Sequence, residues 1–495
     1  MAIVKVCGIE TEYGIHSNNS HDNPVSLSSL LVNSYVTDLE RAGWDFENES
    51  PANDARGFSA TNGQPPQIET HLVNAVLTNG ARYYVDHAHP ELSTPECANP
   101  LELVLYDKAG EEILRRSVVS ANKYLPAESP VTVIKNNSDG KGNSYGCHEN
   151  YLMDREVPFS RIAKQIITHF ITRIIMVGAG KVGTELAGNS RAIPFQLSQR
   201  GEFFEEEIGL ETTLKRPIVN TRDEPHADPA RFRRLHVIVG DANMSEVSTF
   251  LKVGTTALVL AMIEDNWLDN ADIMLANPVH AIHQVSQDVG LSTVLELVNG
   301  TTATALQLQL QIFELASDYV EQNGLSVLGD EEVGKIMMER WESTLESLES
   351  DPMSLSDQLD WVAKYRLLQA YMDRHNASWT DPRLRAIDIQ YHDINPEKSL
   401  YNRVGMERLV TDDEINKAVV TPPRDTRAFF RGMCLAKFSN EIASANWDSL
   451  VFDLKDGPLK RVPMMDPLKG TADHVDTLIQ GSKNATELLH GLEVQ

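Results

Sequence analysis

Several strand-like segments of this chain carry ionisable side chains on one face only, which restricts the fold to a sheet that lines a cleft. Residues 4–15 alternate with a period of two, so Glu10 and Glu12 share one face while Ile9 and Tyr13 share the other. Neighbouring carboxylates repel each other unless water, arginine or a cation compensates their charge. This segment is therefore either a solvated edge strand or part of a Mg²⁺ site.

A second segment, residues 79–96, begins with an Asn-Gly turn signal and continues as a β-prone run. Its alternation collects Arg82, Tyr84 and Asp86 on one face, and Glu91 follows shortly after. Arginine suits phosphate, Asp86 could act as general base or nucleophile, and Glu91 could supply a hard oxygen ligand. A surface salt bridge would explain only part of this pattern.

The same one-sided polarity recurs later in the chain, and helices follow it. Residues 232–239 alternate so that Arg234 and His236 share a face, and residues 203–208 repeat the pattern with two glutamates. Apolar periodicity then predicts helices over 245–264, 305–322, 330–349 and 356–374. A sheet with one ionisable face, backed by helices, is an α+β fold.

The length of the chain predicts more than one domain. At 495 residues it exceeds what one hydrophobic core usually supports. We expect a catalytic domain over residues 1–420 and a small C-terminal domain over 421–495. Residues 41–77 are polar and turn-rich without clear periodicity, which predicts a mobile insertion loop that could act as a lid.

Charge and cysteine usage exclude several classes of function. A net charge of −27 argues against general binding to nucleic acid or to anionic membranes, because both need a basic face. The four cysteines have no metal-finger spacing, so a cytoplasmic location is expected. The longest apolar stretch, residues 253–263, is too short to cross a bilayer and is typical of a buried helix.

A dinucleotide-binding interpretation is also disfavoured. Residues 174–183 end in a Gly-x-Gly-x-x-Gly pattern, but the segment before it has helical periodicity and the segment after it breaks at Gly188 and Pro194. A nicotinamide oxidoreductase would need this motif to work. The Gly140-Lys141-Gly142 loop likewise lacks the full P-loop spacing, so its glycines are better explained as turn formers.

Five motifs together resemble the Pup ligase/deamidase family, whose members process the prokaryotic ubiquitin-like protein Pup. They are Gly-Ile-Glu-Thr-Glu-Tyr-Gly at 8–14, Asn-Gly-Ala-Arg-Tyr-Tyr-Val-Asp-His-Ala-His-Pro-Glu at 79–91, Ser-Tyr-Gly-Cys-His-Glu-Asn-Tyr at 144–151, Asn-Thr-Arg-Asp-Glu-Pro-His-Ala-Asp at 220–228, and Arg-Arg-Leu-His-Val-Ile-Val-Gly-Asp-Ala-Asn at 233–243. The resemblance covers essentially the whole chain, including Asn-Trp-Asp-Ser at 446–449. It implies a glutamine-synthetase-like fold of the carboxylate-amine ligase type: a curved, mainly antiparallel sheet backed by helices, with a small C-terminal domain.

Within this family, two features resemble the deamidase rather than the ligase. The insertion holds Trp-Asp-Phe-Glu at 44–47, and Asp-His-Ala-His-Pro-Glu at 86–91 lacks the extra residue that the ligase has between aspartate and histidine. The resemblance implies deamidation of the C-terminal glutamine of Pup and cleavage of the isopeptide bond between Pup and substrate lysines. A Pup ligase on the same scaffold and a non-enzymatic ATP-binding adaptor are the alternatives.

The resemblance also implies roles for individual residues, with ATP (or ADP with phosphate) and Mg²⁺ as cofactors and with Pup and pupylated proteins as partners. Asp86 would be the catalytic residue. The implied metal ligands are Glu10, Tyr84, Glu91, His148 and His236, and the implied nucleotide contacts are Arg82, Thr94 and Trp447. The two histidines could instead be structural. Arg222 and Arg234 are candidates for binding the terminal carboxylates of Pup, or for ordinary salt bridges within the sheet.

Overall fold

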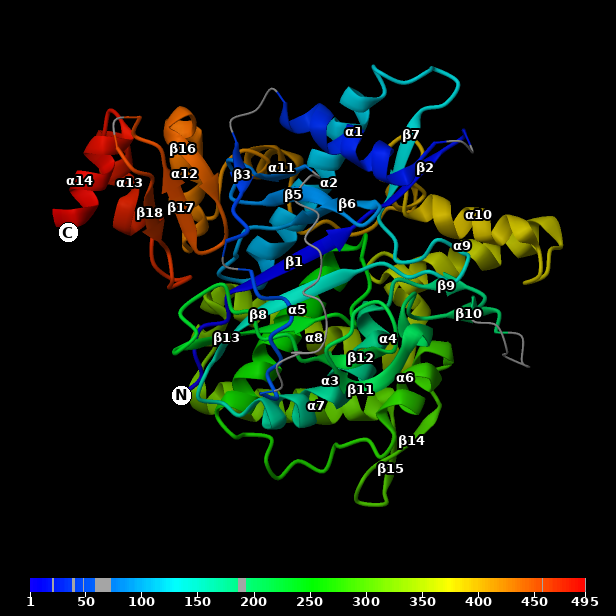
Figure 1. Ribbon diagram of the computed structural model, residues 1–495. Coiled ribbons are helices and arrows are strands. Elements are labelled where there is room, and N and C mark those ends of the chain that lie inside the picture. The colour runs from blue at the N-terminus through cyan, green and yellow to red at the C-terminus, as the bar shows by residue number, and fades with distance from the viewer. Residues whose placement is uncertain are drawn as a thin grey trace.

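A ten-stranded sheet forms the centre of the protein in a computed structural model that describes residues 1–19, 22–37, 41–47, 49–57, 73–185, 193–455 and 457–494. Its strand order is β13-β8-β1-β6-β5-β4-β3-β16-β17-β18, and every neighbouring pair is antiparallel except β3 and β16 (Figure 1). The strands are β1 (Cys7–Glu12), β3 (Ala42–Trp44), β4 (Asn74–Val76), β5 (Arg82–Asp86), β6 (His89–Ser93), β8 (Cys147–Asp154), β13 (Phe232–Val237), β16 (Ile442–Ala445), β17 (Ser449–Phe452) and β18 (Lys460–Pro463).

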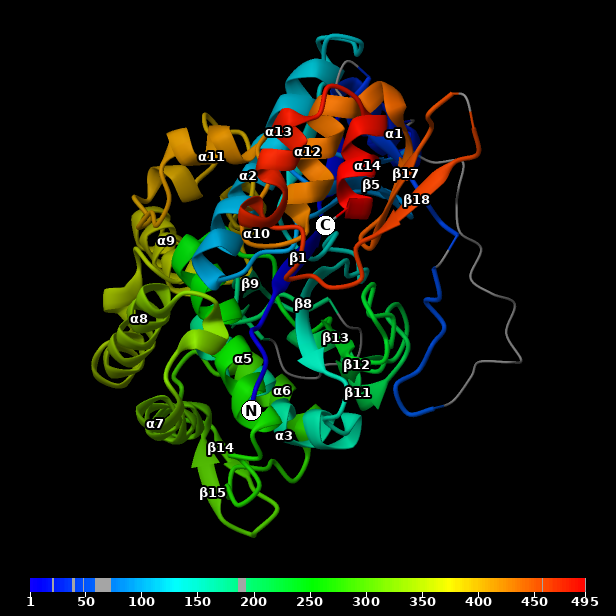
Figure 2. The same ribbon diagram turned by 90° about the vertical axis from the view of Figure 1, so that its left-hand side faces the viewer.

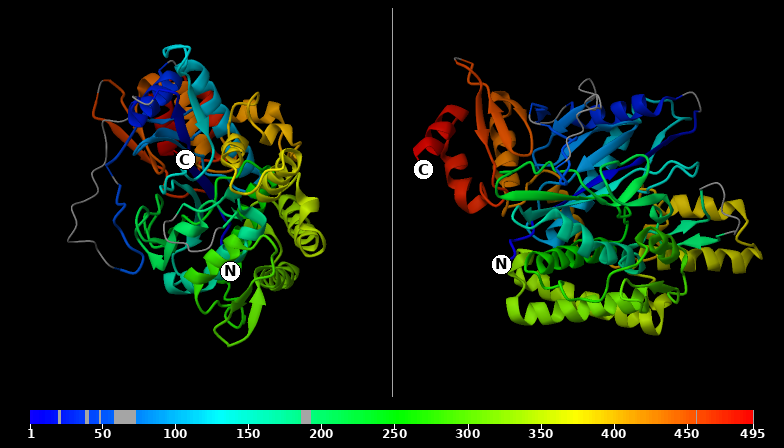
Figure 3. Two further views of the ribbon diagram at one scale, coloured as in Figure 1. Left: turned by 90° about the vertical axis from the view of Figure 1, so that its right-hand side faces the viewer. Right: turned by 60° about the horizontal axis from the view of Figure 1, so that its bottom comes forward.

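Helices cover one face of this sheet and form a further layer beyond it. Contacts link α1 and α2 to β1, β5 and β6, and α5 packs between α2, α3 and α8. Figure 2 and the right-hand view of Figure 3 show the long helices from the middle of the chain, coloured green to yellow, gathered on one side of the sheet. The helices are α1 (Pro24–Val36), α2 (Pro100–Ala121), α3 (Phe159–Thr172), α5 (Glu246–Glu264), α7 (Ala305–Asn323), α8 (Glu331–Ser350) and α9 (Asp360–His375).

The helix α5 confirms that the longest apolar stretch is a buried helix. By length and composition alone α5 could cross a membrane, but all of its residues are buried inside the protein. Apolar side chains on every side of a helix are expected where other helices surround it. This helix is therefore part of the protein core.

The alternation that predicted β1 is confirmed. Cys7, Ile9 and Thr11 are buried toward the helices, while Glu10 and Glu12 point to the other face and are half-buried. Because β1 lies between β6 and β8, its acidic face is flanked by side chains from both neighbouring strands. The centre of the sheet therefore presents a polar face opposite the core.

The glycine motif at 174–183 does not follow a strand. A helical turn, α4 (Ile174–Val177), precedes Gly178, and the short strand β9 (Lys181–Val182) lies within the motif, between Gly180 and Gly183. A dinucleotide fingerprint needs the reverse order, strand then glycines then helix. The expectation that the glycines of the loop at 140–142 form turns is consistent with Gly140 and Gly142, whose φ values are +71° and +102°.

The range 41–77 contains more regular structure than the sequence predicts. Its two ends are β3 and β4, which pair with each other and extend the sheet, while residues 58–72 lie outside the described part of the chain. Both strands have only three residues, too few for a visible alternation. The predicted loop is therefore corrected at both ends, because these ends belong to the sheet.

The C-terminal part of the chain joins the same sheet through β3. Strand β16 pairs in parallel with β3, and Trp44 and Val76 belong to the apolar cluster formed by α12 (Ala428–Phe438), α13 (Ala472–Gly481) and α14 (Ala485–Val494). Figure 1 shows this part, coloured orange and red, at one end of the sheet. The sheet thus runs across residue 420, and the predicted division there stays a prediction.

We predict that Gly432→Ala destabilises the contact between the C-terminal part and the sheet. A Cβ at Gly432 in α12 would lie 2.3 Å from the carbonyl oxygen of Thr78 and 2.9 Å from Cβ of Pro422. Overpacking of this kind costs about 2 kcal/mol, so the melting temperature should fall. Gly481→Ala in α13 is the matched control, because its Cβ meets nothing within 4 Å. Equal melting temperatures for the two variants would contradict the tight packing.

Candidate active site

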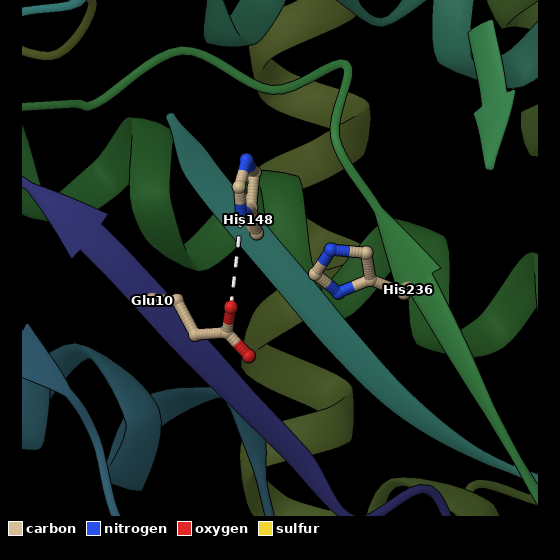
Figure 4. Close-up of side chains that lie close together, drawn as sticks. All are labelled: Glu10, His148 and His236. Carbon is tan, nitrogen blue, oxygen red and sulfur yellow. Dashed lines mark ion pairs between the residues drawn. The ribbon is translucent and has the colours of Figure 1, made fainter. Parts of the chain in front are cut away.

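Three neighbouring strands bring Glu10, His148 and His236 together on the polar face of the sheet. Glu10 on β1 pairs in register with His148 on β8, and β8 pairs in turn with β13, which carries His236. One potential ligand atom from each of the three residues lies within 4.8 Å of the others. The Glu10 Oε2 atom lies 3.5 Å from Nδ1 of His148, and the two imidazole centroids are 4.9 Å apart. Figure 4 shows the three side chains turned toward one another.

A second acidic cluster lies on the other side of β1. Glu12 pairs in register with Glu91 on β6, and with Asp86 on β5 these residues again bring three carboxylate oxygens within 4.8 Å of one another. Hydrogen bonds orient Glu12, because the backbone N–H of Gly146 donates to its Oε1 at 2.8 Å and His89 Nδ1 lies 3.1 Å from its Oε2. Carboxylate oxygens are the ligands that Mg²⁺ prefers in proteins.

The alternation of residues 4–15 places Glu12 on the same face as Glu10, but Glu12 is not among the metal ligands that the resemblance implies. The predicted alternation could have identified Glu12, because it places this carboxylate on the same polar face of the strand as Glu10. The partner it meets there, Glu91, is set by strand register, which a short polar strand does not reveal from sequence alone.

Electrostatics indicate that the two clusters suit divalent cations. Glu91 is only 3% exposed, and its pKa is raised well above the ordinary value, first by burial and then by the carboxylates of Asp86, Glu12 and Glu10. On the other cluster, His236 Nε2 is buried without a hydrogen-bond partner among the described residues. A cation would relieve the repulsion and satisfy the imidazole nitrogen, so the donor set fits a bound metal.

Arg82 is held between two aromatic rings. Its guanidinium lies 3.8 Å from the ring centroid of Trp44 and 4.1 Å from that of Tyr84, and its Nε donates to Oδ1 of Asn74 at 2.9 Å. Burial, followed by the charge of Glu91, raises the pKa of the Tyr84 phenol well above its ordinary value. Tyr84 therefore supports Arg82 as a neutral ring, and its role as a metal ligand stays a prediction.

Trp44 is a functional candidate that sequence reasoning placed only in the insertion. Besides contacting Arg82, its indole N–H donates to Oε1 of Glu49 at 2.6 Å, and its ring meets Trp447 edge to face at 5.5 Å between centroids. Trp44 therefore joins two residues that were predicted to bind the nucleotide. An aromatic residue in a polar segment was the only signal for it.

A cavity beside the first cluster contains some of the predicted nucleotide and substrate residues. Its lining includes Gly8, Glu10, Thr94, Asn150, His226, Arg234, Arg427 and Trp447. The hydroxyl oxygen of Thr94 accepts a hydrogen bond from the backbone N–H of Ile9 at 3.1 Å, which ties β1 to this wall. Arg82 and Arg222 are not among the described residues that line the cavity. The Nε atom of Arg222 is buried without a partner in the described chain.

Glu96 anchors the C-terminal part next to this cavity. Its carboxylate accepts a hydrogen bond from Arg427 Nε at 2.7 Å and forms a further ion pair with Arg431. Arg431 in turn donates to the backbone carbonyl of Trp447 at 3.0 Å, and its guanidinium lies 5.0 Å from the Trp447 ring centroid. Burial opposes the charge, but Arg431 and Arg427 lower the pKa of Glu96 to about 2.

Comparisons with known proteins relate the chain to one family. The model of the Pup-ligase protein family matches residues 5–451. A depupylase of Acidothermus cellulolyticus is 50% identical over 99% of both chains, and a Pup deamidase/depupylase of Mycobacterium tuberculosis is 45% identical over 99% of both chains. The ligase PafA in a crystal structure of its complex with Pup superposes with a TM-score of 0.79 at 34% identity, covering 96% of this chain and 91% of that one.

The same ligase solved in complex with ADP superposes with a TM-score of 0.74 at 38% identity, over 82% of this chain and 89% of that one. The α+β fold, a mainly antiparallel sheet backed by helices, is the glutamine-synthetase-like fold that the resemblance implies. More narrowly, the chain belongs to the Pup-ligase family.

We predict that Glu91→Gln separates cation binding from folding. The amide removes one negative charge from three crowded carboxylates, so the metal-free melting temperature should stay equal or rise. The increase in melting temperature on adding Mg²⁺ should shrink, because one oxygen ligand is weakened. Glu205→Gln, on an exposed position of β11 (Phe204–Gly209), is the control. An unchanged Mg²⁺ response in Glu91→Gln would place the cation elsewhere.

We predict that Glu96→Gln lowers the free energy of unfolding by about 3 kcal/mol at pH 7, since the pKa of Glu96 falls from 4.5 to about 2 on folding. This stability is present above the unfolded pKa and is lost as the pH falls from about 4.5 toward 2. The gap to the unmodified protein should therefore narrow between pH 7 and pH 4 in denaturant titrations. Glu339→Gln, an exposed position on α8, should show no gap at either pH. A gap that is the same at both pH values would contradict the charge-based anchor.

Proposed function

We propose that this chain is a hydrolase that deamidates the C-terminal glutamine of Pup to glutamate and cleaves the isopeptide bond between Pup and substrate lysines. ATP (or ADP with phosphate) and Mg²⁺ would be its bound cofactors, and Pup and pupylated proteins its partners. The observation that carries the proposal is the position of Asp86, an accessible carboxylate at the edge of a buried acidic cluster, in a chain related over its full length to depupylases.

Asp86 is suited to the reaction because it is the accessible member of its cluster. Its side chain is 43% exposed, whereas Glu91 is 3% exposed and cannot reach a substrate carbonyl. As a nucleophile, the Asp86 carboxylate would attack the amide carbon, release ammonia or the lysine amine, and be freed when water hydrolyses the anhydride. As a general base, it would take a proton from the attacking water. Both routes give glutamate and an amine.

The cation ligands we assign are Glu10, His148 and His236 in one cluster, and Glu12 and Glu91 in the other. Mg²⁺ bound there would neutralise the carboxylate charge and stabilise an oxyanion or phosphate oxygens. The residues of the second cluster hold their carboxylates in fixed positions, because they lie on adjacent, hydrogen-bonded strands. Tyr84 would contribute through its ring contact with Arg82.

The nucleotide would occupy the cavity between Glu10 and Trp447. Trp447 would pack against the base, the Thr94 hydroxyl would donate to a phosphate, and Arg82 would reach the phosphates from beside the cavity. Arg82 is aligned for this by Trp44 and Tyr84. A net charge of −27 makes such local cationic groups important for any anionic ligand.

The carboxylates of Pup would be bound by Arg234 and Arg222. Arg234 lines the cavity beside Glu10, at 3.6 Å from its Oε1, and also donates to the carbonyl oxygen of Glu224 at 2.7 Å. It therefore has a structural role as well as a place in the lining of the cavity. Arg222 follows β12 (Arg216–Asn220) and has an unpartnered buried Nε within the described chain, which leaves a donor available for an acidic group.

The four cysteines are buried free thiols, in keeping with a cytoplasmic location.

Two other functions use the same scaffold. A Pup ligase would fit the similarity to PafA, but the depupylase relative is 50% identical, against 34% and 38% for the ligase structures. A non-enzymatic ATP-binding adaptor would keep the cation clusters but would not need Asp86. Product analysis separates all three.

We predict that the chain raises the mass of glutamine-ending Pup by about one dalton in the presence of ATP and Mg²⁺, as an amide becomes an acid. Asp86→Asn should abolish this conversion while retaining ATP affinity, because the amide keeps the shape but loses the negative charge. Asp413→Asn, at an exposed position on α11 (Asp412–Ala418), is the control and should retain full turnover.

Mass spectrometry and ATP calorimetry of the three proteins check this. Lysine conjugation without deamidation or depupylation would support the ligase, and nucleotide binding without any turnover would support the adaptor. Full turnover by Asp86→Asn would exclude Asp86 from catalysis.

A further inference from the structure

We propose that Asn150 is a positioning residue that fixes the tautomer of His236 and thereby aims a nitrogen lone pair at the first cluster. The inference rests on the proposed function only in assigning a cation to that cluster. Asn150 lies on β8 directly opposite His236 on β13, and two residues from His148 on the same strand. Its side chain therefore lies between two strands of the site.

The orientation of the Asn150 amide is determined by its two charged neighbours. Its Nδ2 donates to Oε1 of Glu10 at 2.9 Å, and its Oδ1 accepts from Nη1 of Arg234 at 2.7 Å. A carboxylate can only accept and a guanidinium can only donate. Reversing the amide would set oxygen against oxygen and N–H against N–H, so the observed orientation is strongly preferred.

This orientation determines the protonation of His236. The Nδ1 atom of His236 lies 3.0 Å from Oδ1 of Asn150, which can only accept, so a hydrogen on Nδ1 satisfies this contact. Arg234 Nη1 has a second N–H and lies 3.2 Å from the same nitrogen, so it competes for Nδ1 over a longer distance than the Asn150 contact. A neutral imidazole with hydrogen on Nδ1 has its lone pair on Nε2.

The lone pair on Nε2 of His236 would be available to a cation. It is buried and has no hydrogen-bond partner among the described residues, while the His236 side chain as a whole is 1% exposed. Figure 4 shows the His236 ring beside His148 and Glu10. A buried nitrogen without a donor costs free energy unless it gains a ligand.

His148 differs from His236 in this respect. Within the described chain, Nδ1 of His148 lies 3.5 Å from Oε2 of Glu10, so its tautomer is held only weakly. Asn150 therefore acts on one of the two histidines, and at the same time holds Glu10 through its Nδ2. The hydrogen bonds that orient a ligating histidine raise its affinity for metal.

The tautomer can be tested without metal, by ¹⁵N NMR of histidine-labelled protein with the His236 signals assigned by His236→Gln. We expect His236 to carry its hydrogen on Nδ1 in the unmodified protein and in Asn150→Asp, which keeps the acceptor oxygen. Asn150→Ala should give a mixture of tautomers or the Nε2–H form. An Nε2–H tautomer in the unmodified protein, or an unchanged Nδ1–H tautomer in Asn150→Ala, would overturn the proposal.

Mn²⁺ binding, followed by electron paramagnetic resonance without nucleotide, gives a second readout. Asn150→Ala should raise the Kd for Mn²⁺ by about 10- to 100-fold. The matched control is Gln309→Ala, which removes another buried amide that contacts a histidine, His169, far from the cluster. Gln309→Ala should lower the melting temperature without changing the Mn²⁺ affinity.

The outcomes distinguish the two proposals. If His236→Gln and Glu10→Ala weaken Mn²⁺ binding but Asn150→Ala does not, the cation assignment stands and the positioning role is overturned. If none of the three affects Mn²⁺ binding, while the tautomer still depends on Asn150, the cation assignment in the proposed function fails and the tautomer control remains.

Discussion

The repulsion among carboxylates on the two sides of β1 is the constraint on which the rest of the site depends. Glu10, Glu12, Asp86 and Glu91 occupy one face of three neighbouring strands, and burial of Glu91 makes their mutual repulsion costly. Folding must supply this free energy elsewhere, and the helices packed against the opposite face of the sheet provide the apolar burial that does so. Such a site favours bound cations, because a cation would remove the unfavourable free energy of carboxylate repulsion.

The surroundings keep the acidic groups rigid instead of letting them move apart. Glu12 is held by the Gly146 N–H and His89, and Glu10 by Asn150. Beside the cavity, the ion pairs of Glu96 with Arg427 and Arg431 hold the C-terminal part against the segment that follows β6. The polar face is thus preorganised by hydrogen bonds from backbone and side chains on several strands.

Much of this arrangement follows from local sequence patterns, and the part that does not follow depends on long-range pairing. Alternation along β1 and β5 predicted which side chains share a face, and periodicity predicted α5 and its buried position. The joining of β3 to β16 could not be predicted, because it brings residues 42–44 beside 442–445 and neither strand is long enough to show a pattern. Trp44 was missed as a site residue for the same reason.

The pairing of β3 with β16 brings Trp44 of the insertion beside Arg82 and Trp447. Trp44, at the end of β3, contacts Arg82 with the face of its ring and Trp447 with an edge-to-face contact, so one side chain links Arg82 to Trp447. Glu49 binds the Trp44 indole N–H and lies 3.9 Å from Arg82, which adds a carboxylate that can compete with phosphate for the same guanidinium. A movement of Trp44 and Glu49 would therefore change both the alignment of Arg82 and the negative charge beside it. If Arg82 binds phosphate as proposed, nucleotide binding and the position of Trp44 would be coupled through the indole ring.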